Sequence, residues 1–137
     1  MIQMMDHDGQ PHAIDPRGAL ERVLARIHSL GIYPVIAPEL EFYLIDPKLD
    51  DMGMGQIAST SLTGTPQPMG QVYGLDAYDE FSPVIDAIKT ACDAVAVGAD
   101  AAISEYGKSQ FEINLKHRKD GLRAADEAVL LRRITRI

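Results

Sequence analysis

Four glutamates in two short segments are the residues of this chain best suited to chemistry: Glu39 and Glu41 in the first, Glu105 and Glu112 in the second. Glu39 and Glu41 alternate with apolar residues, so on an extended strand both would point to one face. Carboxylates gathered on one face repel one another unless protons or cations neutralise them. All-oxygen ligation favours Mg²⁺ or Mn²⁺, admits Ca²⁺ and argues against zinc. The four glutamates are therefore candidate metal ligands.

The second segment needs an irregularity to bring its glutamates together. Glu112 and Asn114 share one face of a strand, and apolar residues take the other. Glu105 stands at an odd spacing from Glu112, which would place it on the wrong face of a regular strand. We therefore expect a bulge or loop over residues 107–109, which contain a glycine. The alternative, four glutamates on the solvated face of a sheet with no ligand, stays open.

Helix signals occur before, between and after the glutamate segments. Asp15 fits the N-cap of a first helix that Gly31 would end. A second helix, capped by Asp79 or Ser82, would carry an apolar stripe and end at Gly98.

A last helix is expected after the second glutamate segment. Asp120 fits its N-cap. Its inner face would carry Leu122, Ala125 and Val129, which recur at roughly helical spacing.

The strand pattern predicts the fold class. We expect a strand over residues 33–45, ending at Asp46-Pro47, and a long loop from Met52 to Gly70, where Gly, Ser, Thr and Pro are frequent. Strands of a parallel sheet are usually buried on both faces, whereas these carry one polar and one apolar face. The prediction is an α+β fold with a largely antiparallel sheet, helices packed on its apolar face and the glutamates facing an open, wet cavity.

Composition limits the classes of partner. The chain has 137 residues, 46% of them hydrophobic and 24% charged, as expected of one globular domain. A formal charge of −7, from 13 basic against 20 acidic residues, disfavours nucleic acid and anionic membranes and suits cations. The single cysteine, Cys92, excludes an internal disulfide. With no signal peptide pattern and no membrane-spanning apolar run, a cytoplasmic location is expected.

The two glutamate motifs together resemble the glutamine synthetase superfamily. Residues 37–44 (Ala-Pro-Glu-Leu-Glu-Phe-Tyr-Leu) and 109–114 (Ser-Gln-Phe-Glu-Ile-Asn) carry the resemblance, which is closest to the class I-like branch that includes γ-glutamyl-amine ligases. Residues 15–17 and 123–126 are also similar to that branch. Residues 46–72 match nothing in it.

The resemblance implies a domain arrangement. Residues 1–15 would be a remnant of the N-terminal β-grasp domain, and residues 16–137 the first portion of a catalytic domain whose curved, largely antiparallel sheet holds metals on its concave side. Relatives of this kind are several hundred residues long and form homo-oligomeric rings. The chain is therefore expected to be a piece of a longer protein.

The resemblance also implies a chemistry. Such enzymes use ATP to phosphorylate the γ-carboxylate of glutamate, and ammonia or an amine then displaces the phosphate. Glu41, Glu105 and Glu112 match the ligands of the glutamate-side Mg²⁺ or Mn²⁺, and Glu39 matches a ligand of the ATP-side ion. Tyr73 resembles a position near the ammonium or amine pocket. The remaining ligands of the second ion, the substrate-binding arginines and the main ATP contacts would lie outside this chain.

Three hypotheses about function remain open at this point. Phe111 stands where ammonia-using members commonly have Asn, which favours an amine as acceptor without naming it. The chain could instead be a catalytically inactive metal-binding or assembly fragment of the same fold. An acidic α+β binding module unrelated to the family is the third hypothesis.

Overall fold

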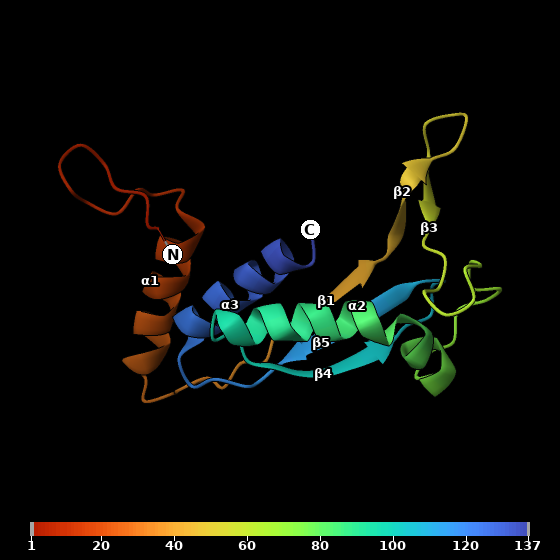
Figure 1. Cartoon of the computed structure of the whole chain (residues 1–137). Coiled ribbons are helices and arrows are strands. Elements are labelled where there is room, and N and C mark those ends of the chain that lie inside the picture. Colours follow the sequence, from red (N-terminus) through yellow and green to blue (C-terminus); the bar gives the residue numbers. More distant parts are fainter. Residues whose placement is uncertain (1, 137) are drawn as a thin grey trace.

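The computed structural model describes residues 2–136 and contains three helices and five strands in that range (Figure 1). In chain order the elements are α1 (Pro16–His28), β1 (Glu39–Tyr43), β2 (Ile45–Leu49), β3 (Gly55–Ile57), α2 (Leu75–Ala94), β4 (Ala99–Ser104), β5 (Gln110–Leu115) and α3 (Gly121–Ile134).

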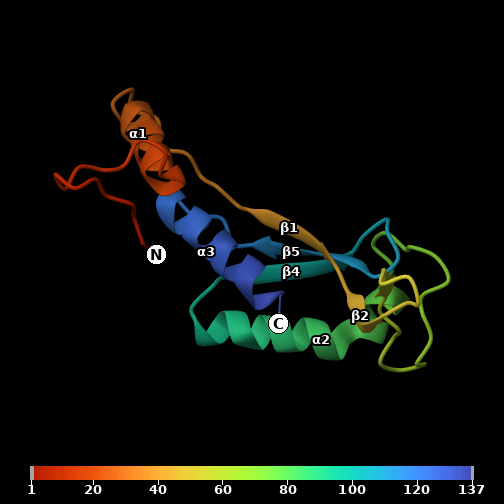
Figure 2. The same ribbon diagram turned by 90° about the horizontal axis from the view of Figure 1, so that it is seen from above.

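One three-stranded sheet organises the fold. Its order is β1-β5-β4 with both pairs antiparallel, and β2 and β3 form a separate antiparallel hairpin that projects from the body of the molecule (Figure 1). Helices α2 and α3 both pack on one side of the sheet (Figure 2). The predicted α+β fold, with an antiparallel sheet and helices on its apolar face, is confirmed.

The hydrophobic core lies between this face of the sheet and the two helices. Phe111, Ile113 and Leu115 of β5 are buried there, since alternate residues of a strand share a face. The helices contribute buried apolar residues, which in α2 come from successive turns: Phe81, Ile85, Ile88 and Cys92 from α2 and Leu131 from α3. The core therefore fixes which side of β5 remains for the glutamates.

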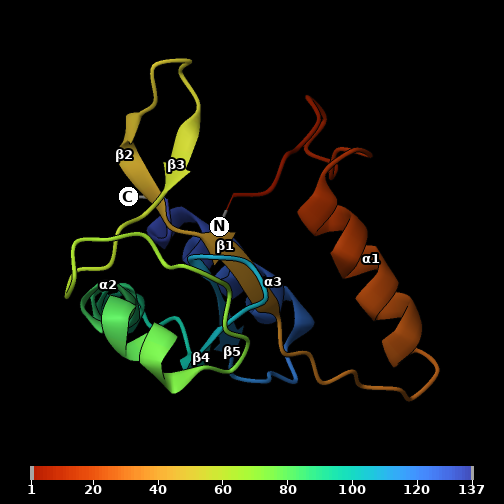
Figure 3. The same cartoon turned by 90° about the vertical axis from the view of Figure 1, so that its right-hand side faces the viewer.

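Helix α1 begins as the sequence predicts but stands apart from the sheet (Figure 3). The Asp15 carboxylate accepts a hydrogen bond from the Gly18 amide at 2.8 Å, which confirms the N-cap. Leu24 is buried, whereas Val23 and Leu30 are exposed. Only a narrow strip of this helix therefore meets the rest of the chain.

Helix α2 begins earlier than predicted. Its N-cap is Gly74, so Asp79 and Ser82 lie inside the helix and the prediction that either caps it was wrong. Pro83 lacks an amide proton for the Asp79 carbonyl, one turn back. The Ser82 hydroxyl donates to that carbonyl at 2.8 Å instead, which lets the helix run through the proline.

The segment after β1 also differs from the prediction. The strand expected over residues 33–45 begins only at Glu39 and breaks after Tyr43. Residues 46 and 47, which were expected to end that strand, lie within β2. The stretch expected to be a loop from residue 52 contains β3. Asp50 makes this possible, because its side chain accepts hydrogen bonds from the Met52 and Met54 amides at 2.9 and 2.7 Å and closes the turn.

Helix α3 has the predicted cap and a shifted inner face. The Asp120 side chain accepts a hydrogen bond from the Arg123 amide at 3.0 Å. Val129, predicted to face inward, is 52% exposed, and the buried positions are Gly121, Ala124, Glu127 and Leu131. Because one of the buried positions, 127, is a glutamate, the apolar periodicity of the sequence does not reveal this face.

Candidate metal centre

The strand register places the four glutamates on one face of the sheet. Glu41 pairs with Glu112 across β1 and β5, and Glu39 pairs with Asn114. Directly opposed residues of an antiparallel pair project to the same side. Glu105 follows β4, and its amide donates to the Gln110 carbonyl at 2.9 Å, which continues the pairing of β4 with β5. All four glutamates therefore face away from the core.

A hairpin turn, not a kinked single strand, brings Glu105 to this face. β4 and β5 are antiparallel neighbours, and residues 106–109 form the turn between them. Ser109 has a φ of 54°, a left-handed conformation that its amide hydrogen bond to Gln67 at 2.8 Å helps to hold. The expected irregularity over residues 107–109 is present, and it reverses the chain.

Glu112 is the most buried of the four glutamates, with 8% of its surface exposed. Burial raises the pKa of Glu112, and the neighbouring Glu39 charge raises it further. The Asn114 side chain acts in the opposite direction, and Glu105 and Glu41 add to the increase. Ionising Glu112 is therefore less favourable than ionising a free glutamate, and a bound cation would offset that cost.

Two further polar side chains complete this face. The Oδ1 atom of Asn114 is buried and has no hydrogen-bond partner within the described residues. Gln110 Nε2 donates a hydrogen bond to the Glu41 carboxylate at 2.7 Å, and Gln110 Oε1 accepts one from the Gly107 amide at 2.8 Å. An uncompensated carboxylate beside an unsatisfied amide oxygen is a donor set that fits a hard divalent cation.

These donors share a face without enclosing a common point. In the part of the chain that the structure describes, no three His, Cys, Asp or Glu side chains are grouped closely enough to hold a metal ion. Glu41 is turned toward Gln110 by their hydrogen bond. The arrangement can supply carboxylates to a cation from both strands, but the side chains would have to move to close around it.

Tyr73 lies beside the same end of the sheet. Its amide donates to the Ser104 carbonyl at 2.9 Å, one residue before Glu105, and its φ is 57°, which is unusual for a tyrosine. Its side chain is exposed. Sequence reasoning missed Ser104, whose buried hydroxyl donates to the Gln71 carbonyl at 2.6 Å and so ties the Tyr73 loop to β4. The sequence signal that could have indicated Ser104 is a single serine among the apolar residues on the core face of a strand.

Phe111 does not face the glutamates. It is fully buried on the opposite side of β5, with its ring edge-on to Phe81 at a centroid separation of 5.2 Å. Any effect of this residue on the choice of acceptor would have to pass through the packing of the strand.

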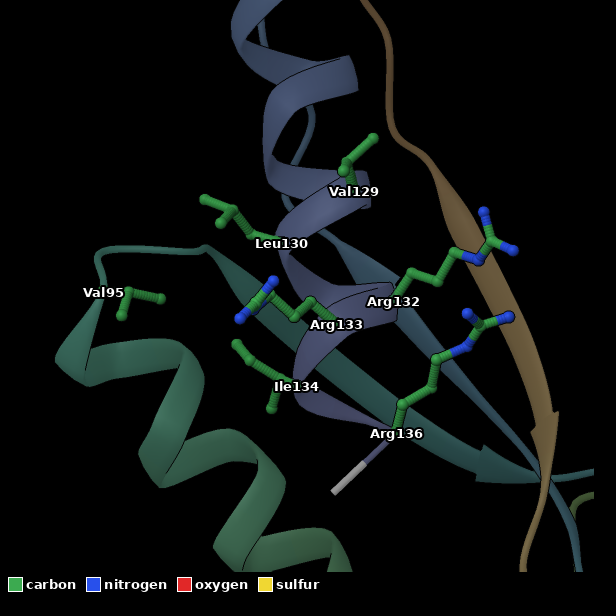
Figure 4. A pocket seen from close by; sticks show the side chains of 7 residues that line it. All are labelled: Val95, Val129, Leu130, Arg132, Arg133, Ile134 and Arg136. Atoms are coloured by element: carbon green, nitrogen blue, oxygen red, sulfur yellow. The ribbon is translucent and has the colours of Figure 1, made fainter. Parts of the chain in front are cut away.

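A cavity of about 1030 Å³ lies elsewhere in the described residues. Figure 4 shows Leu130, Ile134 and Val95 between α3 and the end of α2, with Arg133 on the same side of α3 and Arg132 and Arg136 extending from its other side. These helices pack on the apolar face of the sheet, so the cavity is separated from the glutamates. Cationic side chains in the last turn of α3 favour the helix dipole, which accounts for Arg132 and Arg133.

Comparisons with known proteins agree with this architecture. A family model described as glutamine synthetase, catalytic domain, matches residues 13–137. Gamma-glutamylputrescine synthetase PuuA of Escherichia coli (strain K12) is 36% identical over all 137 residues, which cover 29% of that protein. The glutamate–isopropylamine ligase of Pseudomonas sp is 26% identical over 125 residues, 91% of this chain and 26% of the relative.

A solved structure shows the same fold. A GmaS/ADP complex matches with a TM-score of 0.72 and 26% identity over 93% of this chain and 27% of that one. Together the sheet, its helices and the family match define a portion of a catalytic domain. The chain belongs to the glutamine synthetase family, and it spans less than a third of the length of these relatives. Within the described residues, no helix is long and apolar enough to cross a membrane.

Proposed function

We propose that this chain forms the glutamate-side part of the active site of an ATP-dependent ligase that joins an amine or ammonia to the γ-carboxylate of glutamate. The observation that carries the proposal is the pairing of Glu41 with the buried Glu112 on a face shared with Glu39 and Glu105. The names of two relatives, a gamma-glutamylputrescine synthetase and a glutamate–isopropylamine ligase, support a ligase with an amine as acceptor.

Each glutamate has a proposed role. Glu41, Glu105 and Glu112 would hold Mg²⁺ or Mn²⁺ on the glutamate side, and Glu39 would contribute to an ion on the ATP side. When bound, these ions neutralise negative charge as a phosphoryl group moves from ATP to a carboxylate. The ADP-bound relative supports a nucleotide as co-substrate.

The residues of the chain prepare this face for cations. Glu112 has to be ionised to bind one, and Glu39, which pairs with Asn114, lies on the same face of the sheet. Tyr73, beside Glu105 at the edge of β4, is proposed to contact the acceptor amine through its exposed ring. An ammonium group suits an aromatic face that stands next to a carboxylate.

The 137-residue chain alone is proposed to bind metal without turning over ATP. Three carboxylates supply charge but lack the substrate oxygens that would complete a divalent ion's shell, so binding should be weak. The domain assignment, with residues 1–15 from the preceding β-grasp domain and 16–137 from the catalytic domain, and assembly into a homo-oligomeric ring belong to the same proposal.

Titration with Mn²⁺, followed by electron paramagnetic resonance, tests the site. The parent chain should bind Mn²⁺ at pH 7 and more weakly as the pH falls, and Glu112→Ala should weaken binding about tenfold or more. Asp86→Ala, an exposed position on α2, serves as the matched control. Equal affinities of the parent and Glu112→Ala would reject the assignment. Glutamate- and amine-dependent ATP turnover by the purified chain would reject the partial-site proposal.

A further inference from the structure

The strands β1, β5 and β4 meet at one end beside a group of charged side chains. Glu127 of α3 is 4% exposed, yet the mechanism proposed above gives it no role. Its carboxylate pairs with the Arg118 guanidinium at 3.1 Å and with Arg123 Nε at 2.8 Å. A buried carboxylate held by two arginines needs an explanation outside the proposed metal site.

Arg118 connects Glu127 to β5 and β1. Arg118 follows β5, and it exchanges two backbone hydrogen bonds with Ile36, which precedes β1, at 2.9 and 2.8 Å. Nearer the sheet, the Leu115 amide donates to the Pro38 carbonyl at 2.9 Å. One residue thus holds the end of β5 to the start of β1 by its backbone, while its side chain reaches α3.

The same group also reaches β4. Gly98 precedes β4, and its carbonyl accepts a hydrogen bond from the Lys116 amide at 2.7 Å. A Cβ atom at Gly98 would lie 2.8 Å from Arg118 Nη2, so the guanidinium rests directly on this glycine. The backbone amide of Gly98 further contributes to the lowered pKa of Glu127, which places the carboxylate next to it.

We propose that Glu127 is a positioning residue for the glutamate face. Through Arg118 and Gly98 it fixes the common end of β1, β5 and β4, and this sets the register in which Glu41 opposes Glu112 and Glu105 reaches the same side. This inference rests on the proposed function in one respect: metal binding is what the first experiment measures. Two measurements separate the positioning role of Glu127 from the proposed binding of metal.

The first measurement is Mn²⁺ affinity in variants shown by circular dichroism to be folded. Glu127→Gln keeps the volume of the side chain and removes its charge, and we expect Mn²⁺ binding about tenfold weaker or more, the size seen when support around metal ligands is lost. Arg118→Lys keeps the charge but loses the planar group over Gly98, and it should weaken binding in the same way. Arg118→Lys also replaces Glu127→Gln if that variant fails to fold.

The matched control is Asp126→Asn. This change breaks the neighbouring ion pair between α3 and Arg17, and the variant should bind Mn²⁺ as tightly as the parent does.

The second measurement is amide hydrogen exchange without metal. Glu127→Gln should accelerate exchange of the Leu115, Lys116 and Arg118 amides about tenfold and Asp126→Asn should not. Folded Glu127→Gln with the parent's Mn²⁺ affinity, or with the parent's exchange rates at these amides, overturns the inference. If the parent binds no Mn²⁺, the proposed metal function fails, and the exchange rates alone decide whether Glu127 holds the strands.

Discussion

Glu41 of β1 lies directly opposite Glu112 of β5, so two carboxylates of like charge face each other across an antiparallel pair. Such a pair destabilises a sheet, and here one partner is also buried. The face is therefore held in an electrostatically unfavourable arrangement by the packing behind it, where Ile113 and Phe111 are fully buried.

Neutralising Glu112 should stabilise the metal-free chain. Because the pKa of Glu112 is raised on folding, its contribution to stability is fully present below the ordinary value of 4.5 and is lost as the pH rises through the folded value. Glu112→Gln should thus be more stable than the parent at pH 7, by up to about 1 kcal/mol. Urea unfolding at pH 4 and pH 7 measures this, with exposed Asp86→Asn as control. A parent chain as stable as Glu112→Gln at pH 7 would contradict it.

Glu127 should give the opposite pH dependence. Burial alone would raise its pKa, but hydrogen bonds from Arg123 and Arg118 outweigh burial and lower it. Its stabilisation is therefore present above about pH 4.5 and lost as the pH falls through the folded value. Glu127→Ala should cost about 3–5 kcal/mol at pH 7, because it leaves buried charges unpaired. Thermal unfolding between pH 3 and 7 should show that the difference in stability between the parent and Glu127→Ala becomes smaller in acid. A difference that does not change with pH would count against the ion pairs.

Gly70 should tolerate no side chain. A Cβ atom there would collide with the backbone carbonyl of Tyr106 in the β4–β5 turn, and backbone cannot move aside as a flexible side chain can. We expect Gly70→Ala to destabilise the chain by about 1–3 kcal/mol, as overpacking does. Gly55→Ala is the matched control, since nothing lies within 4 Å of its added Cβ. Equal melting temperatures of the two variants would show that the turn is not packed against residue 70.

The isolated chain should self-associate irregularly. β1 and β4 are edge strands, and the β2–β3 hairpin exposes Ile45, Leu49 and Met54. Unpaired strand edges and exposed apolar side chains favour association without a closed symmetry. Light scattering should give a broad, concentration-dependent mass, narrowed by Ile45→Lys combined with Leu49→Lys. A single sharp oligomer, or a monomer with cooperative unfolding, would refute this.

Local signals in the sequence were sufficient for some elements. Asp15 and Asp120 cap helices whose first turns follow them directly, so both N-termini could be predicted. The alternation around Glu39 and Glu41 likewise predicted the two faces of β1. Helix α2 escaped this reasoning because Pro83 resembles a first-turn residue, and only the Ser82 hydroxyl shows how the helix passes it.

What the sequence could not predict depends on partners far along the chain. The break after β1 follows from its pairing with β5, and the position of Glu105 follows from a hairpin that spacing alone did not distinguish from a bulge. Ser104 and Glu127 looked like ordinary polar residues, since their partners come from other elements.

Gln110 has a consequence for how strongly a cation could be held. Its amide group is engaged at both ends, by the Gly107 amide and by the Glu41 carboxylate. A cation that takes this oxygen of Glu41 competes with Gln110, so its observed affinity is the intrinsic one reduced by the cost of breaking that hydrogen bond. Occupancy would in turn free one end of the Gln110 side chain, whose other end accepts the hydrogen bond from Gly107 in the β4–β5 turn. Binding on the face of the sheet and mobility of the turn beside Glu105 are therefore thermodynamically linked.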